Sequence, residues 1–384
     1  MTVSALTRPG ERDRLIVKLA NIDWTFALLL SIIAGIGGVM LYSIAGGEWW
    51  PWAAPHLIRY AGCLVLMIIL AMVDLRVWFA LAYPVYAVGV LLLAAVDVVG
   101  HSALGAQRWL DLGPIRIQPS EIIKIGLVLA LARFYHTLSG RNARLSWWLL
   151  IPAALIGLPA ALVAKQPDLG TALLIAATGG VMMILAGLSL RLVAIGLAGV
   201  VAVVPLAFMF VLKSYQKARL LTFLDPEADK SGSGYHIMQS KIALGSGGLL
   251  GKGFGLGTQS QLNFLPEKQT DFIFASLAEE FGFVGSVAVL LLYMAVIFMA
   301  LRIASVSHSH FGRMAASGVT ATFALCLMIN GAMVMGLAPV VGVPMPLLSW
   351  GGTVMITVMV GFGLVQSVRV HRYSEVTSGR GALL

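Results

Sequence analysis

Long apolar stretches alternate with short polar connections along the whole chain. Crossing about 30 Å of hydrocarbon takes roughly 20 mostly apolar residues in a helix, and the strict apolar-polar alternation of a membrane barrel is absent. The qualifying stretches lie at about residues 24–45, 54–73, 77–96, 119–137, 146–164, 171–187, 190–212, 273–301, 314–336 and 351–369. The pattern therefore predicts an all-α, polytopic membrane bundle of about ten transmembrane helices, with one long extracytoplasmic loop.

Composition supports this class. The chain of 384 residues is 59% hydrophobic and 11% charged, which leaves too few polar side chains to coat a water-soluble globule of that size. The net charge of +9 would favour a nucleic-acid partner in a soluble protein, but here it is explained by the loops, and we expect no nucleic acid. Cys63 and Cys326 lie in apolar stretches without metal-ligand spacing, so neither a disulfide nor zinc is expected.

The distribution of charge predicts the topology, because cytoplasmic loops collect Lys and Arg. With the N-terminus inside, the basic residues of the inner segments are Arg8, Arg12, Arg14, Lys18, Arg76, Arg133, Arg141, Arg144, Arg191, Arg302, Arg313, Arg369, Arg372 and Arg380. The short outer loops and helix ends hold Arg59, Arg108, Arg116, Lys124 and Lys165, whereas most carboxylates fall outside. We therefore expect a multi-pass protein of the bacterial inner membrane with both termini cytoplasmic.

The chain reads as a single integral membrane domain over residues 1–384, with no internal repeat. Residues 1–23 are expected to be a cytoplasmic tail that leads into an uncleaved first helix, and residues 370–384 a second cytoplasmic tail. The connection at 213–272 would be a large periplasmic loop. Loops of that length are usually functional or disordered, and its apolar residues favour an ordered structure with short amphipathic pieces.

Four predicted outer segments combine polar groups with Pro or Gly at a helix mouth. They are residues 105–124, which contain GAQRWLDLG and QPSEIIK; 165–171, KQPDLGT; the end of the long loop at 264–274, FLPEKQTDFIF; and 339–353, PVVGVPMPLLSWGGT. Irregular backbone at membrane depth is tolerated where it lines a protein-walled or wet cavity. All four segments are therefore candidates to converge on one cavity, with Ser349 of the last segment a candidate substrate contact.

Three charged residues at these mouths have both a structural and a functional interpretation. Glu121 and Lys124 lie three apart on one helix face, where they form either a brace between helices or part of a site. Asp168 either caps a turn or faces the cavity. Ionisable residues inside membrane spans are functional candidates by default, so all three are treated as candidate catalytic residues.

Asp271 is the sharpest candidate, because it opens an apolar helix after a polar, Pro-containing loop. Thr270 and Asp271 are also favoured helix caps, and a cap and a base are compatible roles. Desolvation at the lip of an apolar cavity raises a carboxylate pKa toward that of a useful base. For Glu279 and Glu280, spacing does not decide between a position against other helices and one in the cavity.

Other residues are weaker candidates for substrate binding. Arg108 and Trp109 are either an interfacial anchor or a clamp for a lipid pyrophosphate and a sugar face. The glycine cluster at 245–257 lacks the Gly and Ser/Thr of a nucleotide-binding P-loop at positions 246 and 253, so no nucleotide is expected. Its glycines more simply allow tight turns, and Lys252 is a candidate contact to a lipid phosphate.

The four segments, in this order and at these spacings, resemble the SEDS family (shape, elongation, division, sporulation) over nearly the whole chain. Residues 165–171 and 263–275 are similar to the RodA-like elongation members rather than to the division members. Trp350 stands where Tyr is usual, and Met345 where Leu is usual. The resemblance implies a peptidoglycan glycosyltransferase that polymerises lipid II into glycan strands at the outer membrane face, with an essential aspartate at Asp271.

The implied reaction inverts the anomeric carbon of a donor sugar that leaves undecaprenyl pyrophosphate, and it removes a proton from the 4-hydroxyl of the acceptor. One carboxylate base suffices, and Asp271 is the candidate. Cations would stabilise the departing pyrophosphate, and the candidates are Lys124, Arg108 and Lys165. Glu121 and Asp168 could instead hold Mg²⁺ or Mn²⁺, or could orient Lys124.

Expected partners, again from the resemblance, are a class B penicillin-binding protein that supplies cross-linking, other elongation-complex proteins, undecaprenyl-linked glycan and membrane lipids. Two rival functions are a transporter that flips lipid II and a non-catalytic scaffold. The inner loops are short and basic with no matching acid cluster, which disfavours alternating access. A scaffold leaves the outer carboxylates unexplained.

Overall fold

The computed structural model of the protein describes residues 15–99, 101–103, 106–111, 116–138, 149–189, 191–196, 198–199, 202, 214–225 and 232–376. The first half contains helices α1 (Leu15–Asn21), α2 (Trp24–Ile44), α3 (Ala53–Ala71), α4 (Leu75–Val99), α5 (Pro119–Leu138), α6 (Leu150–Lys165) and α7 (Leu169–Leu185). The second half contains α9 (Ser214–Leu224), α10 (Ser233–Ser246), α11 (Thr258–Gln261), α12 (Ile273–Val306), α13 (His310–Val334) and α14 (Gly352–Val370).

The predicted membrane bundle is confirmed. Helices α2 to α7 and α12 to α14 coincide with the apolar stretches of the sequence, whereas the stretch at 190–212 lies largely outside the described residues. Within the described residues, α2, α3, α4, α12, α13 and α14 are long and apolar enough to cross a membrane, and α6 and α7 are apolar but shorter. The loop at 213–272 contains α9, α10 and α11, in agreement with the short helical pieces expected there.

One feature was not expected from the apolar pattern. Between α4 and α5 the chain forms a small antiparallel ribbon of β1 (His101–Ala103), β2 (Ala106–Asp111) and β3 (Arg116–Ile117), in the order β1-β2-β3. Leu110 pairs with Ile117, and Asp111 pairs with Arg116. The strands are too short for their alternation to stand out from the helical background, and β2 carries Trp109 to the start of α5.

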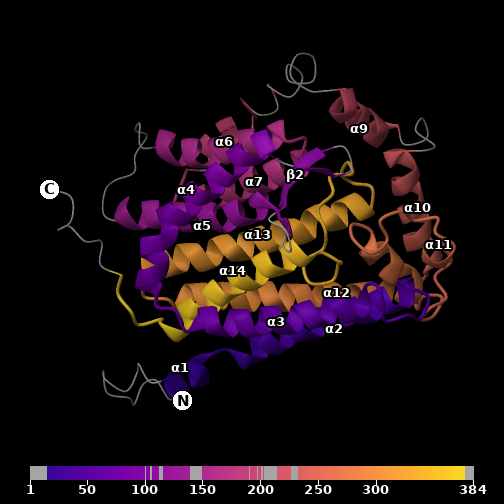
Figure 1. The fold of residues 1–384 in the computed structure, drawn as a ribbon, viewed down its shortest axis with the longest axis horizontal. Helices are drawn as coiled ribbons and strands as arrows, with labels where there is room; N and C mark the ends of the chain where they lie inside the picture. Colours follow the sequence, from indigo (N-terminus) through magenta and orange to yellow (C-terminus); the bar gives the residue numbers. More distant parts are fainter. Residues whose placement is uncertain are drawn as a thin grey trace.

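The helices pack in two groups that meet at α13 (Figure 1). Helices α2, α3, α12 and α14 lie along one side, with α14 against α3 and α2 against α12, and α4 to α7 form the other side. Helix α13 contacts α5, α7, α12 and α14, so it is the shared core element. The aromatic rings of Phe323 and Phe362 meet edge to face 4.9 Å apart where α13 crosses α14.

One end of the bundle gathers the start of α2 and the end of α14. The backbone N–H of Asp23 donates to Gln366 Oε1, and the Gln366 side chain donates back to the Asp23 carbonyl. Ser367 donates to the Val73 carbonyl, and His308 N–H donates to the Arg372 carbonyl. The first long helix, α2, therefore begins at the same end of the bundle at which the last helix, α14, ends. Helices α10 and α11 lie at the opposite end (Figure 1).

At that opposite end α12 is interrupted at Gly282, whose φ of 66° is not helical. The interruption leaves backbone groups without partners inside the helix, and the glycine-rich loop 247–257 supplies them. Lys252 N–H and Gly253 N–H donate to the carbonyls of Glu279 and Glu280, 3.0 Å away in each case. Phe283 N–H and Val284 N–H donate to the carbonyls of residues 248 and 249. The loop thus supplies hydrogen-bond partners to the backbone on both sides of the helix break.

The close approach of this loop explains a requirement for glycine. A Cβ at Gly251, whose φ is +83°, would lie 2.1 Å from the Glu280 carbonyl oxygen. Gly248 also has a positive φ, +55°, but an added Cβ there meets nothing within 4 Å. Substitutions at these two glycines therefore distinguish the energetic cost of a left-handed backbone, which both share, from the cost of a steric clash, which only Gly251 has.

Gly251→Ala is expected to destabilise the protein by about 1–3 kcal/mol more than Gly248→Ala does, because the overpacked Cβ forces the loop out of the α12 break. Both variants share the left-handed penalty of about 1–2 kcal/mol. The measurement is the thermal unfolding midpoint of each purified variant in the same detergent. Equal midpoints would contradict the insertion of the loop.

Candidate active site

A cavity of about 370 Å³ opens at the end of the bundle that carries α10 and α11, where all four sequence segments meet. Its lining combines residues from the ribbon, from the first turns of α5 and α7, from the loop before α12 and from the segment before α14. The described lining residues that bear polar or aromatic groups are Trp109, Gln118, Glu121, Lys124, Asp168, Thr171, Glu267, Thr270, Asp271, Trp350 and Thr353. The predicted convergence is therefore present in the fold.

The Glu121–Lys124 pair forms the inner wall. Lys124 Nζ lies 2.8 Å from Glu121 Oε1, and the side chains are only 8% and 7% exposed. The three-residue spacing on one helical face, seen in the sequence, accounts for the contact. The second carboxylate oxygen, Glu121 Oε2, is buried and has no hydrogen-bond partner. The pair is thus both an intrahelical ion pair and a cavity wall with one unsatisfied acceptor.

Asp168 is both a helix cap and a cavity residue. Its carboxylate accepts hydrogen bonds from Thr171 N–H at 3.2 Å and from the Thr171 hydroxyl at 2.9 Å, as the N-cap of α7. A Cβ at Gly170 would lie 2.4 Å from the Val341 carbonyl oxygen. The first turn of α7 therefore packs closely against the segment before α14. Both interpretations of Asp168 from the sequence hold: its carboxylate caps the first turn of α7, and the same residue lines the cavity.

Asp271 lies half-buried at the lip, one residue before the N-cap of α12. The N-cap is Phe272 and carries no side-chain hydrogen bond, so the expectation that Asp271 itself caps the helix is wrong. The backbone there turns through a wide loop in which Phe272 N–H bonds the Glu267 carbonyl. A Cβ at Gly342 would lie 3.6 Å from Asp271 Oδ2, so that glycine keeps the space beside the carboxylate open.

Three residues outside this loop hold it in place, and one of them, Asn330, carried no functional signal in the sequence. Asn330 of α13 is fully buried and donates to the carbonyls of Asp271 and Val343, both at 2.8 Å. Ser349 donates to the Thr270 carbonyl at 2.6 Å and accepts from Met345 N–H. Trp350 N–H donates to the Gln269 carbonyl at 2.8 Å. The segments before α12 and α14 are therefore held together around Asp271.

Two lining residues were not singled out from the sequence. Glu267 has a positive φ of 49° and accepts a hydrogen bond from Thr270 through its carboxylate at 3.0 Å. Gln118 precedes α5 and lies among the lining residues. In the sequence each of these two residues lies next to a proline. Polar residues beside proline are common in turns, so this feature alone did not indicate a site.

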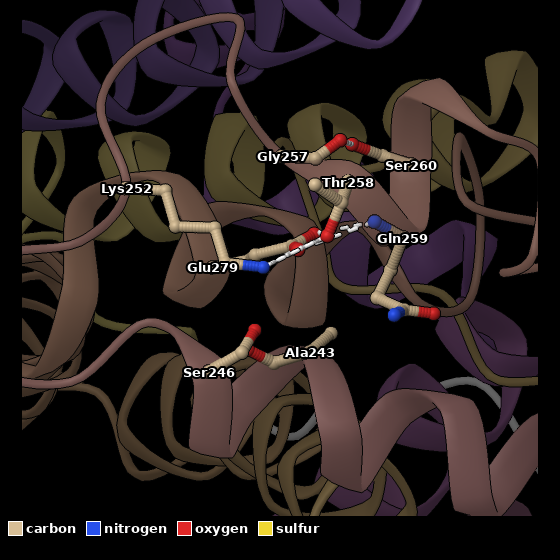
Figure 2. Close-up of polar contacts among 8 residues, drawn as sticks. All are labelled: Ala243, Ser246, Lys252, Gly257, Thr258, Gln259, Ser260 and Glu279. Carbon is tan, nitrogen blue, oxygen red and sulfur yellow. Dashed lines mark hydrogen bonds and ion pairs between the residues drawn. The ribbon is translucent and has the colours of Figure 1, made fainter.

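A second polar cluster surrounds Glu279 (Figure 2). The buried Glu279 carboxylate accepts from Lys252 Nζ at 2.7 Å, from the Thr258 hydroxyl at 2.9 Å and from Gln259 N–H. It therefore caps the short helix α11 from outside that helix. Glu280 accepts from the Ser43 hydroxyl at 2.6 Å and from Gly255 N–H. Both glutamates thus hold neighbouring segments and do not line the cavity.

Lys268 connects α11 to the lip. Its ammonium is buried and donates to the Ser260 carbonyl and to Asn263 Oδ1. Burial lowers the pKa of Lys268 from the ordinary value of a lysine, because the charged form is desolvated. Lys268 therefore helps to close the loop from 260 to 268, together with the backbone bond from Leu265 N–H to the Gln259 carbonyl. Glu267 and Asp271 lie directly beside it in the sequence.

The remaining sequence candidates lie elsewhere. Lys165 is exposed at the end of α6 and does not line the cavity, and Lys252 is engaged by Glu279 and Thr258. Ser349 positions the lip through two backbone contacts and is likewise absent from the lining. The side chain of Arg108 lies outside the described residues, although its neighbour Trp109 lines the cavity.

The charges of the cavity limit its chemistry. Among its described lining residues, Glu121, Asp168, Glu267 and Asp271 bear carboxylates, and Lys124 is the one cation and is already paired. Such a surface accepts hydrogen bonds from hydroxyl groups, offers oxygen ligands to a hard cation, and has a candidate general base in Asp271. It suits a neutral polyhydroxylated substrate.

Comparisons with known proteins show the family to which the chain is related. The profile of the FtsW/RodA/SpoVE family, described as cell cycle proteins, matches residues 21–374. The peptidoglycan glycosyltransferase MrdB of Escherichia coli K12 is 44% identical over 92% of this chain and 94% of its own length. The stage V sporulation protein E of Bacillus subtilis is 33% identical over 91% of this chain and 88% of its own length.

Solved structures give the same result. A chain from a structure titled for the coordination of polymerization and crosslinking by a peptidoglycan synthase complex superposes with a TM-score of 0.76 at 33% identity, over 92% of this chain and 98% of the other. The rod shape determining protein RodA of Thermus thermophilus superposes with a TM-score of 0.68 at 30% identity, over 92% of this chain and 98% of the other.

Proposed function

Since the chain belongs to the FtsW/RodA/SpoVE family, we propose that it is an inverting peptidoglycan glycosyltransferase that polymerises lipid II into glycan strands during cell elongation. The observation that carries the proposal is that Asp271, Asp168 and the Glu121–Lys124 pair line one shared cavity. The elongation role is supported by the 44% identity to MrdB and by the superposition on RodA.

In this function Asp271 removes the proton from the acceptor 4-hydroxyl as that oxygen attacks the donor anomeric carbon. The bond from that carbon to the donor pyrophosphate breaks, and undecaprenyl pyrophosphate leaves with the electron pair. Lys124, the one cation among the described lining residues of the cavity, stabilises the charge that develops on the leaving group. Asp168 and Glu267 accept hydrogen bonds from sugar hydroxyls and so orient the two rings.

Within the described residues no three His, Cys, Asp or Glu side chains group closely enough to hold a metal ion by themselves, so a divalent cation here would depend on substrate phosphate oxygens as well as on protein ligands. Glu121 Oε2 is a buried oxygen without a partner, and Asp168 presents a second carboxylate to the same cavity, so Mg²⁺ or Mn²⁺ would be held by these two residues. When bound, the ion would offset the excess of carboxylates and the charge of a pyrophosphate. Nucleotides and zinc have no place in the proposal.

The proposed partner is a class B penicillin-binding protein, together with other elongation-complex proteins. Support comes from the superposition on a chain of a complex whose title joins polymerization to crosslinking. Lipid II and undecaprenyl-linked glycan would reach the cavity from the surrounding membrane lipids.

A transport function is less well supported. A separate pocket of about 30 Å³, which shares Lys124 with the cavity, is lined mostly by apolar residues such as Val128, Phe323 and Val358. A volume of that size holds about one water molecule and does not pass a disaccharide. A scaffold function leaves the buried, unpartnered Glu121 oxygen without an explanation.

We place the cavity at the outer face of the inner membrane and both termini in the cytoplasm, on the strength of the basic inner segments. In a variant without Cys63 and Cys326, cysteines introduced at Ser233 and Ser139 are expected to react with an impermeant thiol reagent from opposite sides of the membrane. Labelling of both positions from the same side would contradict this orientation.

The deciding experiment is glycan-strand formation by the purified protein with lipid II, with and without its penicillin-binding partner. Strands that lengthen with time support the proposal, and their complete absence in both conditions contradicts it. Titration with a chelator, followed by Mg²⁺ or Mn²⁺, tests the ion separately. Full activity in excess chelator would remove the metal from the proposal.

A further inference from the structure

Arg59 lies on the second turn of α3, at the end of the bundle where the cavity opens. Its helix presents an apolar stripe to the surroundings, in which Ile58, Val65 and Ile69 are 65%, 57% and 57% exposed. In a membrane protein such a stripe faces lipid. Arg59 is exposed next to this stripe, near the predicted outer boundary of the hydrocarbon, where phosphate groups of lipids lie.

The guanidinium of Arg59 stacks on the indole of Trp350. The central carbon of the guanidinium lies 4.2 Å from the ring centroid, and Trp350 itself lines the cavity. Arg59 does not line the cavity, so the indole connects a cation at the lipid-facing surface to the interior. Tryptophan is the strongest aromatic partner for a cation.

Stacking leaves the hydrogen-bonding donors of Arg59 available. Within the described part of the chain, no hydrogen bond or ion pair engages its guanidinium. An arginine offers five N–H donors in a planar fork that matches a phosphate. The indole fixes the plane of this fork without using any of its donors.

The cavity needs a cation of this kind. A polymerase of lipid-linked sugars holds two pyrophosphates, one on the donor and one on the acceptor. The described cavity lining carries an excess of carboxylates, and Lys124 is already paired with Glu121. The donor pyrophosphate must lie at the reaction centre, whereas the acceptor pyrophosphate lies one disaccharide away from the hydroxyl that Asp271 deprotonates.

We propose that Arg59, held by Trp350, binds the pyrophosphate of the acceptor lipid at the lipid-facing rim of the cavity. This assignment rests on the proposed function. It places the acceptor sugars between the rim and Asp271, where the carboxylates meet hydroxyl groups, and keeps the acceptor phosphates outside the anionic interior. The donor approaches from elsewhere around the same cavity.

The test uses the full-length protein in nanodiscs with its partner. A lipid-linked tetrasaccharide is held at saturation as donor while lipid II is varied as acceptor. Arg59→Gln is expected to raise KM for lipid II about tenfold with kcat nearly unchanged, because one charge-assisted contact to phosphate is lost. Arg59→Lys, which keeps the charge but loses the fork, should give a smaller rise.

A matched control is Arg302→Gln, which removes an exposed arginine at the opposite end of the bundle and should leave both constants unchanged. When lipid II is held at saturation and the donor is varied, Arg59→Gln should show an unaltered KM. A rise in the donor KM alone, or a fall in kcat alone, would overturn the assignment.

The phosphate could also come from bulk lipid. Replacement of the nanodisc phospholipids by a phosphate-free glycolipid such as digalactosyldiacylglycerol should not abolish the difference between wild type and Arg59→Gln. Disappearance of the difference would assign the site to lipid headgroups and overturn the proposal. Binding of lipid II, measured in an Asp271→Asn background so that no turnover occurs, should also weaken about tenfold when Arg59→Gln is added. This readout judges the site even if the wild-type protein forms no strands, a result that would count against the proposed function alone.

Discussion

Asp271→Asn is expected to lower the rate of glycan-strand formation by about 10²- to 10⁴-fold, roughly 3–5 kcal/mol of barrier, because a positioned base is lost. Lipid II binding should be nearly unchanged, since the amide still bonds a hydroxyl. Stability should also change little. The cap of α12 is Phe272, and the bond from Asn330 goes to the backbone carbonyl of residue 271, which the substitution keeps.

The measurement is strand formation by the purified variant with its partner present, beside its thermal unfolding midpoint. Asp271→Glu serves as the companion variant, because it restores a carboxylate one methylene out of place. Partial activity of that variant would favour a base over a purely geometric role. Near-normal polymerisation by Asp271→Asn would remove Asp271 from the mechanism and leave Glu267 or Asp168 as the next carboxylate of the cavity to test.

Lys124→Met is expected to reduce both stability and activity. It leaves Glu121 buried without its cation, and removal of one partner from a buried pair costs about 3–5 kcal/mol of unfolding free energy. Polymerisation per folded molecule should fall at least about tenfold, equivalent to about 1.4 kcal/mol, through loss of charge stabilisation of the leaving pyrophosphate.

The double variant Glu121→Gln with Lys124→Met separates the two effects. With both charges removed, most of the lost stability should return, because no unpaired charge remains buried. Activity should stay low if the pair acts in catalysis. Recovery of activity together with stability would instead identify the pair as a brace. Thermal unfolding and strand formation measured on the same three samples decide between the two roles.

Much of the candidate site could be predicted from short-range features. The spacing of Glu121 and Lys124 along one helix face predicted their contact, and the Gly- and Pro-rich helix mouths predicted a shared cavity. The capping role of Asp168 was also foreseen as an alternative. These features depend on helix geometry over a few residues, so they can be predicted without knowledge of how the helices pack.

Other features depended on contacts between distant segments. The exclusion of Asp271 from the cap of α12, the bond from Asn330 to its carbonyl and the engagement of Lys252 by Glu279 join residues that local spacing does not relate. The break of α12 at Gly282 looks like one more small residue in an apolar run, and its purpose appears only with the loop that fills it.

The sequence by itself determined the membrane class, the ordering of the helices and the predicted side on which the carboxylates gather, because hydropathy and charge act on each segment separately. Only the tertiary structure decided which of the outer groups share a cavity and which serve as internal supports. That choice depends on how α13 brings α5, α7, α12 and α14 together, and on which backbone groups the loops must satisfy where water is absent.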